Sequence, residues 1–376
     1  MPTVEDRLTS TLDVVAADAA AVDEEGRFPE RSIDALRRSG LLGLTLPAEA
    51  GGLGAGPVEF ADVTTRLAAA CGSTAMVYLM HVAAAMPVAA APPPGLPDAV
   101  GHLASGSWLG TLAFSEKGSR SHFWAPLSRA IPDGNGRVHV KAVKGWVTSA
   151  GLADLYVVSC LAPDDQHPTD TNLYALATDG HDLVVAAPWD GLGLRGNASA
   201  PMEIDTDVDE RQRLGARGEG FRLMMEVVLP WFNLGNAAVS VGLARAGLDA
   251  AVAHCTGARF EHLDSTLADL PTIRARLARA AIELDATAAY VRETAARMAA
   301  GDDTVMLSVL GVKAAANDTA LRVTDEAMRV CGGAAFSKHL AVERAFRDAR
   351  AGHVMAPTAD ALYEFYGRAL CGLDLF

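Results

Sequence analysis

The chain reads KGWVTSAG at residues 144–151, and the interpretation of the whole sequence begins with this stretch. Trp146 and Thr148 stand two residues apart, and side chains two apart on a β-strand point to the same side of the sheet. We therefore expect a strand that offers a flat apolar ring and a hydroxyl to the same planar ligand. A core tryptophan beside an ordinary strand threonine explains the pair equally well. The rest of the sequence has to decide between the two.

The composition bounds the fold and the kinds of partner. A length of 376 residues favours two or three domains, and half of the residues are hydrophobic, which is ample for a large core. Alanine is abundant and aromatic residues are few, so close-packed helices are favoured over a β-sandwich. The net charge of −14 opposes binding to nucleic acid or to an anionic membrane surface. These features are typical of an acidic enzyme.

The cysteines and the apolar runs indicate a cytoplasmic protein. The five cysteines are odd in number and form no C-x-x-C pair, so we expect free thiols, no disulfide framework and no metal site. The N-terminus lacks a basic stretch followed by an apolar one, which predicts no signal peptide. The apolar run at residues 82–91 ends at three prolines, far short of a membrane span.

Helical and strand patterns are segregated along the chain. We predict a helical domain over residues 1–107, a β domain over 108–214 and a helical bundle over 215–376. Short runs rich in Val, Leu and Tyr alternate with turn residues in the middle part, and residues 132–136, PDGNG, predict a hairpin turn. Residues 273–298 carry apolar side chains at helical spacing. Segregation excludes the alternating Rossmann pattern and favours a mainly α protein with a middle antiparallel barrel or sandwich.

Several further motifs occur in a fixed order. Residues 112–121 form a loop segment upstream of the Trp-x-Thr strand, Arg259 follows it, and CGGAAF and ERAFRD occupy residues 331–336 and 343–348. Two weaker glycine-rich stretches lie at residues 47–54 and 192–197. In this order the motifs resemble those of the acyl-CoA dehydrogenase superfamily. The chain departs from that family's Gly-Ser-Asp triplet at residues 120–122, which read RSH, and from its Arg-x-x-Phe motif at His262.

The resemblance implies a fold, a cofactor and an assembly. The expected fold has an N-terminal helical domain, a middle β-barrel and a C-terminal four-helix bundle, with FAD bound between the last two domains. The expected assembly is a homodimer or homotetramer, in which Arg259 and the Gly332-Gly333 pair bind FAD from a neighbouring subunit. The FAD contacts that the resemblance assigns are Phe114, Ser115, Ser121, Trp146, Thr148, Arg259, Gly332, Gly333 and Thr358.

The resemblance fails at the catalytic carboxylate. Most members of the family place a Glu near the C-terminus, and the matching position here is Ala356; a minority place it on a helix, where this chain has Phe232 followed by Asn233. These three residues are therefore the predicted substrate contacts. The remaining acid–base candidates are Glu116, Glu226, His353, Asp360 and Glu364.

Three functions stay open at this point. The first is a flavin-dependent oxidoreductase that acts on an acyl thioester, bound to CoA or to a carrier protein, and passes electrons to a partner protein. The second is a flavin monooxygenase that uses oxygen on a small molecule and receives reduced flavin from a partner reductase. The third is a non-catalytic helical binding protein. The visible spectrum of the purified protein separates the third from the first two.

Overall fold

The computed structural model describes residues 2–120, 122–163 and 167–374. Ser121, a predicted FAD contact, lies outside the described residues. Contacts divide the chain into two units, the first formed by Met1–Phe60, Met76–Gly191 and Arg195–Phe232, the second by Ala61–Ala75, Leu192–Leu194 and Asn233–Phe376. The boundaries between the units fall inside three helices, so the predicted domain limits at residues 107 and 214 stay a prediction.

Helices begin the first unit. They are α1 (Val4–Glu25), α2 (Glu30–Ser39), the short 3-10 turns η1 (Leu41–Gly43) and η2 (Ala48–Ala50), the start of α3 (Pro57–Ala70), most of α4 (Gly72–Ala90), and α5 (Ala99–Ser105). Thr3 and Asp6 form a capping box at the start of α1, which satisfies amide groups that the first helical turn leaves without partners. Helix α2 ends at Gly40, which takes the left-handed conformation typical of a helix C-terminus.

His81 ties α4 to two other elements. Its ring is fully buried; Nδ1 accepts a hydrogen bond from the Gly110 amide, and Nε2 lies 3.0 Å from the Leu42 carbonyl. An amide donor at one nitrogen and a carbonyl acceptor at the other fix a neutral ring with its proton on Nε2. Burial lowers the pKa of His81 to about 4.

An eight-stranded sheet follows. Its strands are β1 (Gly110–Ala113), β2 (Arg129–Pro132), β3 (Arg137–Val147), β4 (Leu155–Leu161), β5 (Thr171–Ala177), β6 (Leu183–Val185), β7 (Ala200–Asp209) and β8 (Arg213–Leu214). They pair in the order β6-β7-β3-β2-β4-β5-β8, and β1 adds to β4 in parallel. The predicted hairpin turn at residues 132–136 is confirmed, because β2 and β3 pair antiparallel across it.

One core fills the inside of this sheet. Strand β3 alternates exposed and buried residues over most of its length, as expected of a strand with one buried face. Buried side chains of β3, β4, β5 and β7 form a single cluster that includes Val140, Tyr156, Tyr174 and Ile204. The inward faces of strands across the whole sheet therefore enclose a common core, as in a barrel.

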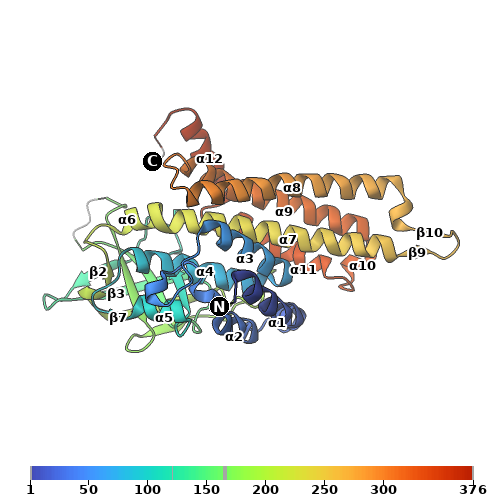
Figure 1. Cartoon of the computed structure of the whole chain (residues 1–376). Coiled ribbons are helices and arrows are strands. Elements are labelled where there is room, and N and C mark those ends of the chain that lie inside the picture. The colour runs from blue at the N-terminus through green and yellow to red at the C-terminus, as the bar shows by residue number, and fades with distance from the viewer. Residues whose placement is uncertain (1, 121, 164–166, 375–376) are drawn as a thin grey trace. The chain divides into compact units, whose positions relative to one another are not determined.

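The second unit is helical. It contains most of α7 (Leu229–Gly257), α8 (Pro271–Ala299), α9 (Met306–Cys331), α10 (Gly333–Phe336), α11 (Val342–Val354) and α12 (Ala359–Leu370). Helix α9 packs against α8, α11 and α12 (Figure 1). The first unit ends with the 3-10 turn η3 (Glu210–Gln212), the helix α6 (Gly220–Leu223), the π-helical turn η4 (Met224–Val228) and the start of α7. The predicted helix over residues 273–298 is confirmed as α8.

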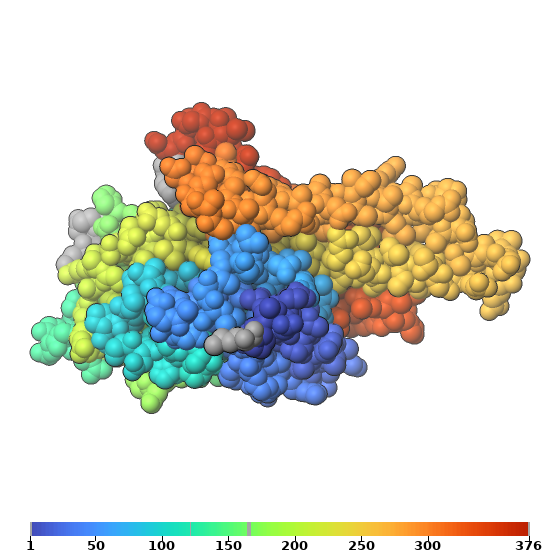
Figure 2. Space-filling view, viewed as in Figure 1, coloured from blue at the N-terminus to red at the C-terminus, as the bar shows by residue number. Residues whose placement is uncertain are grey.

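A hairpin interrupts the helices of the second unit and corrects one prediction. Arg259 falls within the predicted helical bundle of residues 215–376, but it does not lie on a helix. Helix α7 ends at Gly257, and the strands β9 (Arg259–Phe260) and β10 (Ser265–Thr266) pair antiparallel before the 3-10 turn η5 (Leu267–Asp269) and α8. Gly257 and Pro271 flank this segment, and both residues disfavour helix continuation. Figure 2 shows the hairpin projecting from the end of the long helices.

Two helical stretches are long and apolar enough to cross a membrane by length and composition alone. They are Gly72–Ala90 and Gly220–Gly257, and most of each apolar window is buried inside the protein. Burial of that extent is typical of core helices. The order of helices, a β-sheet and further helices confirms the predicted fold class.

Candidate functional site

The end of β3 presents Trp146 in an unusual conformation. The pairing of β3 with β7 shifts between Lys144 and Val147, which is a β-bulge, and Trp146 has a φ of +58°. A positive φ is uncommon for a bulky residue and is found mainly where the surrounding structure imposes it, often at functional sites. The Trp146 side chain is 70% exposed, whereas large aromatic side chains are usually buried. The bulge therefore holds an indole ring outward.

The bulge also corrects the reasoning from strand alternation. Thr148 lies one residue beyond the end of β3 and is buried, whereas Trp146 is exposed, so the two side chains do not alternate along a regular strand. The Thr148 hydroxyl lies 3.0 Å from the Ser199 hydroxyl, and the Thr148 carbonyl accepts a hydrogen bond from Thr111. The extra residue of the bulge breaks the two-residue period on which the prediction was based.

The loop after β1 lies beside this strand end. The Gly145 amide donates to the Ser115 carbonyl at 2.8 Å, and the backbones of Glu116 and Lys144 form an isolated antiparallel β-bridge. Phe114 is buried and stacks on Phe123 with the ring planes 5° apart. The structure thus brings together four of the predicted FAD contacts, Phe114, Ser115, Trp146 and Thr148, although they come from segments about 30 residues apart in the sequence.

A buried ion pair joins the two segments. Lys144 Nζ donates to Glu116 Oε1 and, at 2.6 Å, to the Ser159 carbonyl, and the Lys144 side chain is fully buried. The other carboxylate oxygen of Glu116 accepts the amides of Leu127 and Ser128 at 2.7 and 3.0 Å. Burial raises the pKa of Glu116, but the Lys144 charge and the hydrogen bonds outweigh it and leave the pKa below its usual value.

The pair argues against Glu116 as the missing base. A general base needs a free lone pair near the proton that it removes and a pKa near the working pH. The Glu116 carboxylate instead accepts four protein donors, counting the Ser128 hydroxyl, and holds a lowered pKa. Its position fits a structural link between the Ser115 loop and the Trp146 strand.

The predicted substrate contacts of the second unit lie near a polar network. Asn233 is fully buried; its amide nitrogen donates to the Val309 carbonyl, while its Oδ1 has no hydrogen-bond partner among the residues that the structure describes. One helical turn later, the Asn236 amide points to the Met355 sulfur at 3.7 Å. Met355 is the residue before Ala356, so the α7 face that carries Asn233 and Asn236 reaches the segment that carries the predicted substrate contact Ala356.

The other candidate acids and bases of the chain sit in ordinary surroundings. Glu226 pairs with Arg222 and Glu364 with Arg368, in each case four residues apart on one helix at an exposed position. His353 Nδ1 lies 3.3 Å from Asp318 Oδ1 without forming a hydrogen bond. Asp360 is exposed in the first turn of α12, and Thr358 is the N-cap of that helix.

Arg259, Gly332 and Gly333 lie at one end of the second unit. The Cys255 thiol near the end of α7 contacts the Val330 carbonyl near the end of α9, which places the hairpin and the glycine pair at the same end of the bundle. Arg259 is exposed and lies 3.7 Å from the exposed Asp264 carboxylate. Gly332 has φ +57° and ψ −135°, a region that glycine alone adopts at low cost. A Cβ on either glycine would meet no atom within 4 Å.

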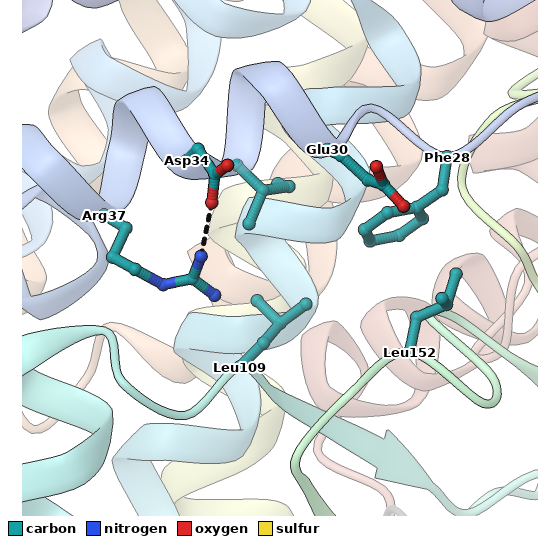
Figure 3. A pocket seen from close by; sticks show the side chains of 7 residues that line it. Phe28, Glu30, Asp34, Arg37, Leu109 and Leu152 are labelled. Carbon is teal, nitrogen blue, oxygen red and sulfur yellow. Dashed lines mark hydrogen bonds and ion pairs between the residues drawn. The ribbon is translucent and has the colours of Figure 1, made fainter.

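A small pocket elsewhere in the first unit lies beside α2. It is lined by Phe28, Glu30, Ile33, Asp34, Arg37, Leu109 and Leu152 (Figure 3). Its volume of about 230 Å³ is below the roughly 300–1,000 Å³ of typical small-molecule sites. Arg37 is held by Asp34 and by the Gly106 carbonyl, so its charge is already satisfied within the protein. We assign this pocket no function.

Comparisons with known proteins decide the family. Three models match in order: the N-terminal domain of acyl-CoA dehydrogenase at residues 9–91, its middle domain at 111–206 and its C-terminal domain at 218–370. The chain belongs to the acyl-CoA dehydrogenase superfamily. The matches confirm the predicted family. They also confirm the prediction of a flavin-dependent oxidoreductase with FAD as its cofactor.

Individual relatives agree over nearly the full length. The chain is 28% identical to cyclohex-1-ene-1-carbonyl-CoA dehydrogenase of Geobacter metallireducens, over 95% of this chain and 93% of that protein. It is 26% identical to the mitochondrial short-chain specific acyl-CoA dehydrogenase of Bos taurus, over 91% and 82%. The fold of butyryl-CoA dehydrogenase from Megasphaera elsdenii superimposes with a TM-score of 0.91 at 22% identity, over 99% of both chains.

The first unit also fits FAD on its own geometry. An exposed indole is held outward by a bulge, beside a glycine whose Cβ would meet no atom within 4 Å. The neighbouring Ser149 hydroxyl is buried and finds no hydrogen-bond partner in the described part of the chain, which is uncommon for a polar group in a folded protein. A flat ring with polar edges would cover the indole and offer groups to this end of the strand.

Proposed function

We propose that this protein is an FAD-dependent oxidoreductase that acts on an acyl thioester. The observation that carries the proposal is the meeting of the Ser115 loop with the bulged strand end that presents Trp146. FAD bound there supplies the acceptor for two electrons. Trp146 offers an apolar face to the ring, and the buried pair of Glu116 and Lys144 holds the two segments together. The Thr148 hydroxyl is buried against the Ser199 hydroxyl, so a contact with the ring edge needs that hydroxyl pair to rearrange.

The substrate contacts are apolar where the family carries a carboxylate. Ala356 and Phe232 have no group that accepts a proton, so the α-proton of a thioester is not removed at either position. General base catalysis contributes about 10²–10⁴-fold in rate. We therefore propose that ordinary saturated acyl-CoA thioesters are poor substrates. Asn233 stands where the family carries an arginine, and its fully buried side chain, bound to the Val309 carbonyl, offers no positive charge to a CoA group.

We further propose a homo-oligomer, an electron-accepting protein partner and a cytoplasmic location. Support for the oligomer comes from Arg259 and the Gly332-Gly333 pair, which are exposed in this chain and stand at the positions that bind FAD pyrophosphate across subunits in the family. Arginine suits that role because its guanidinium binds phosphate oxygens in a bidentate manner. All five cysteines are free thiols, as in proteins of a reducing compartment.

The decisive experiment begins with the visible spectrum of the purified protein. We expect bound FAD, less of it in Trp146→Ala, and wild-type content in Trp108→Ala, which removes a tryptophan that stacks on His102 elsewhere in the unit. Protein that neither carries nor takes up FAD would refute the proposal.

The substrate class is tested on the bound flavin. Under anaerobic conditions a panel of CoA and carrier-protein thioesters is added, and bleaching of the flavin absorbance measures oxidation of the thioester. If no thioester bleaches the flavin, and reduced flavin with oxygen gives a hydroxylated small molecule instead, the oxidation of thioesters is wrong and the protein is a monooxygenase.

A further inference from the structure

A second buried lysine lies under the segment that carries Ala356. Lys313 on α9 is fully buried, and its Nζ donates to the carbonyls of Gly352, Met355 and Pro357 at 3.1, 3.1 and 2.8 Å. Among residues 2–120, 122–163 and 167–374 no carboxylate pairs with it. A buried ammonium without an ion-pair partner is costly and is seldom found in folded proteins.

The partners fix the charge of Lys313. Three carbonyl oxygens need three N–H donors, and a neutral amine has only two. Burial lowers the pKa of Lys313 to about 7, whereas hydrogen bonds to three carbonyls favour the charged form. A lysine that is held as an ammonium has no lone pair to accept a proton. The three carbonyl acceptors favour the ammonium form of Lys313, and we do not assign it as the missing base.

The three carbonyls define one short segment. Gly352 belongs to the last turn of α11, where the final four carbonyls lack helical partners and the helix dipole attracts a cation. Met355 and Pro357 flank Ala356 on either side. The ammonium thus caps α11 and holds the backbone directly before and directly after residue 356.

A neutral network supports the same segment from α7 and α9. The Asn317 amide also donates to the Gly352 carbonyl, at 2.7 Å, and the Ser240 hydroxyl donates to Asn317 Oδ1 at 2.8 Å. Position 352 has to be glycine for this approach, because a Cβ would lie 2.8 Å from Asn317 Oδ1. The α11 terminus is therefore built to lie close to α9, where Lys313 reaches it.

We propose that Lys313 is the positioning residue of the substrate segment, and that its ammonium sets where the backbone of residues 355–357 and the side chain of residue 356 lie. The proposed effect on catalysis rests on the proposed function. The proposed effect on the position of residues 355–357, called the mechanical part below, concerns the second unit alone. A carboxylate placed at position 356 would be delivered to the substrate by the same three hydrogen bonds.

The first test measures hydrogen–deuterium exchange of the FAD-loaded protein. Lys313→Met keeps an unbranched side chain that is one atom shorter and removes the donors. Exchange of amides in residues 352–362 should rise about tenfold or more, because hydrogen bonds to charged groups are among the stronger ones and local opening follows their loss. Exchange in α8 should stay unchanged. Lys338→Met, an exposed lysine of the same unit, is the matched control and should behave as wild type.

Two results would overturn the mechanical part. One is an unchanged exchange rate at residues 352–362 in Lys313→Met, and the other is an equal rise in α8, which would indicate general loosening. If Lys313→Met does not fold, Asn317→Ala removes one donor to the Gly352 carbonyl and keeps the ammonium. Its exchange at the end of α11 should rise above that of the wild-type protein, and no rise at all would overturn the proposal that these hydrogen bonds hold the segment.

The second test links the segment to catalysis. Ala356→Glu and the double variant Ala356→Glu/Lys313→Met are compared for desaturation of a simple acyl-CoA, with FAD content measured in parallel. The double variant should lose about 10²-fold in kcat with little change in KM, because a misplaced carboxylate still permits binding. Equal kcat in both variants would refute the positioning role. If Ala356→Glu itself gains no activity, the proposed function fails while the exchange result still decides the role of Lys313.

Discussion

Removal of either partner of the buried pair between Glu116 and Lys144 should destabilise the protein strongly. Both side chains are nearly inaccessible to solvent, so a lone charge left behind has no water to solvate it. Breaking such a pair costs about 3–5 kcal/mol. Glu116→Gln is the more severe change, because it places an amide N–H2 or an uncharged oxygen opposite the ammonium. Lys144→Met leaves the carboxylate with three donors, from Leu127 and Ser128.

The pair predicts a specific pattern across variants. Glu116→Gln should lower the free energy of unfolding by about 3–5 kcal/mol, and the double variant Glu116→Gln/Lys144→Met should recover about 1–3 kcal/mol of that loss, since no charge remains buried. Lys141→Met on the same strand is the matched control. Lys141 is exposed and pairs with Asp205 at 3.1 Å, and such surface pairs contribute about 0–1 kcal/mol.

The assay is urea-induced unfolding followed by circular dichroism at a fixed excess of FAD, with flavin content read from the visible spectrum. Loosening of the Ser115 loop from Gly145 should lower FAD affinity as well as stability. The pair would be shown to be unimportant if Glu116→Gln were as stable as Lys141→Met. If Glu116→Gln kept both its stability and its FAD but lost turnover, Glu116 would be the catalytic base and our assignment would be wrong.

Three further outcomes are expected. The pKa of His81 is about 4 in the folded protein and about 6.5 in the unfolded chain, so the stability that the neutral ring contributes is fully present above pH 6.5 and is lost as the pH falls. Between about pH 7.5 and pH 5 this residue should lower the free energy of unfolding by about 2 kcal/mol. The decrease should be smaller in His81→Gln. Arg259→Ala should lose FAD while circular dichroism stays unchanged, and full FAD binding by a monomer in light scattering would contradict the subunit role. Glu226→Gln and Glu364→Gln should keep turnover within about twofold, because exposed pairs four residues apart contribute only about 0.5 kcal/mol; a loss of about 10²-fold in either identifies the base.

The sequence predicted the elements well because their patterns are local. Short apolar runs between turn residues marked the β domain and the turn between β2 and β3, and helical periodicity marked α8 within a residue or two of its observed ends. The bulge at Trp146 was not predictable in this way. A bulge adds one residue to one strand, and the reason for it lies in the partner strand β7, about 55 residues later. The hairpin at Arg259 was missed for a different reason: its strands are two residues each, too short for a period to appear.

The two buried lysines, Lys144 and Lys313, can be recognised in the sequence because each stands at a position that the pattern of its strand or helix assigns to a buried face. Val138, Val140 and Ala142 are the inward residues of β3, and Lys144 follows with the same parity. A lysine at an inward position of a strand has to find a partner, and the nearest acidic residue of the loop after β1 is Glu116. On α9, Lys313 follows Val309 by four residues and so shares its apolar face. Its carbonyl partners could not be predicted, because they depend on how α11 ends.

The two buried lysines help to interpret the absence of the family's catalytic carboxylate at Ala356. Replacement of a buried charge by an apolar side chain of similar size is often neutral or stabilising, so a chain that needed only stability could dispense with both ammonium groups. Lys144 holds the segments that present Trp146 and Ser115, and Lys313 holds the segment around Ala356. If these segments had no function, holding them in place would not justify the free-energy cost of burying two ammonium groups. We therefore expect the segment around residue 356 to contact a substrate, although Ala356 has no group that accepts a proton.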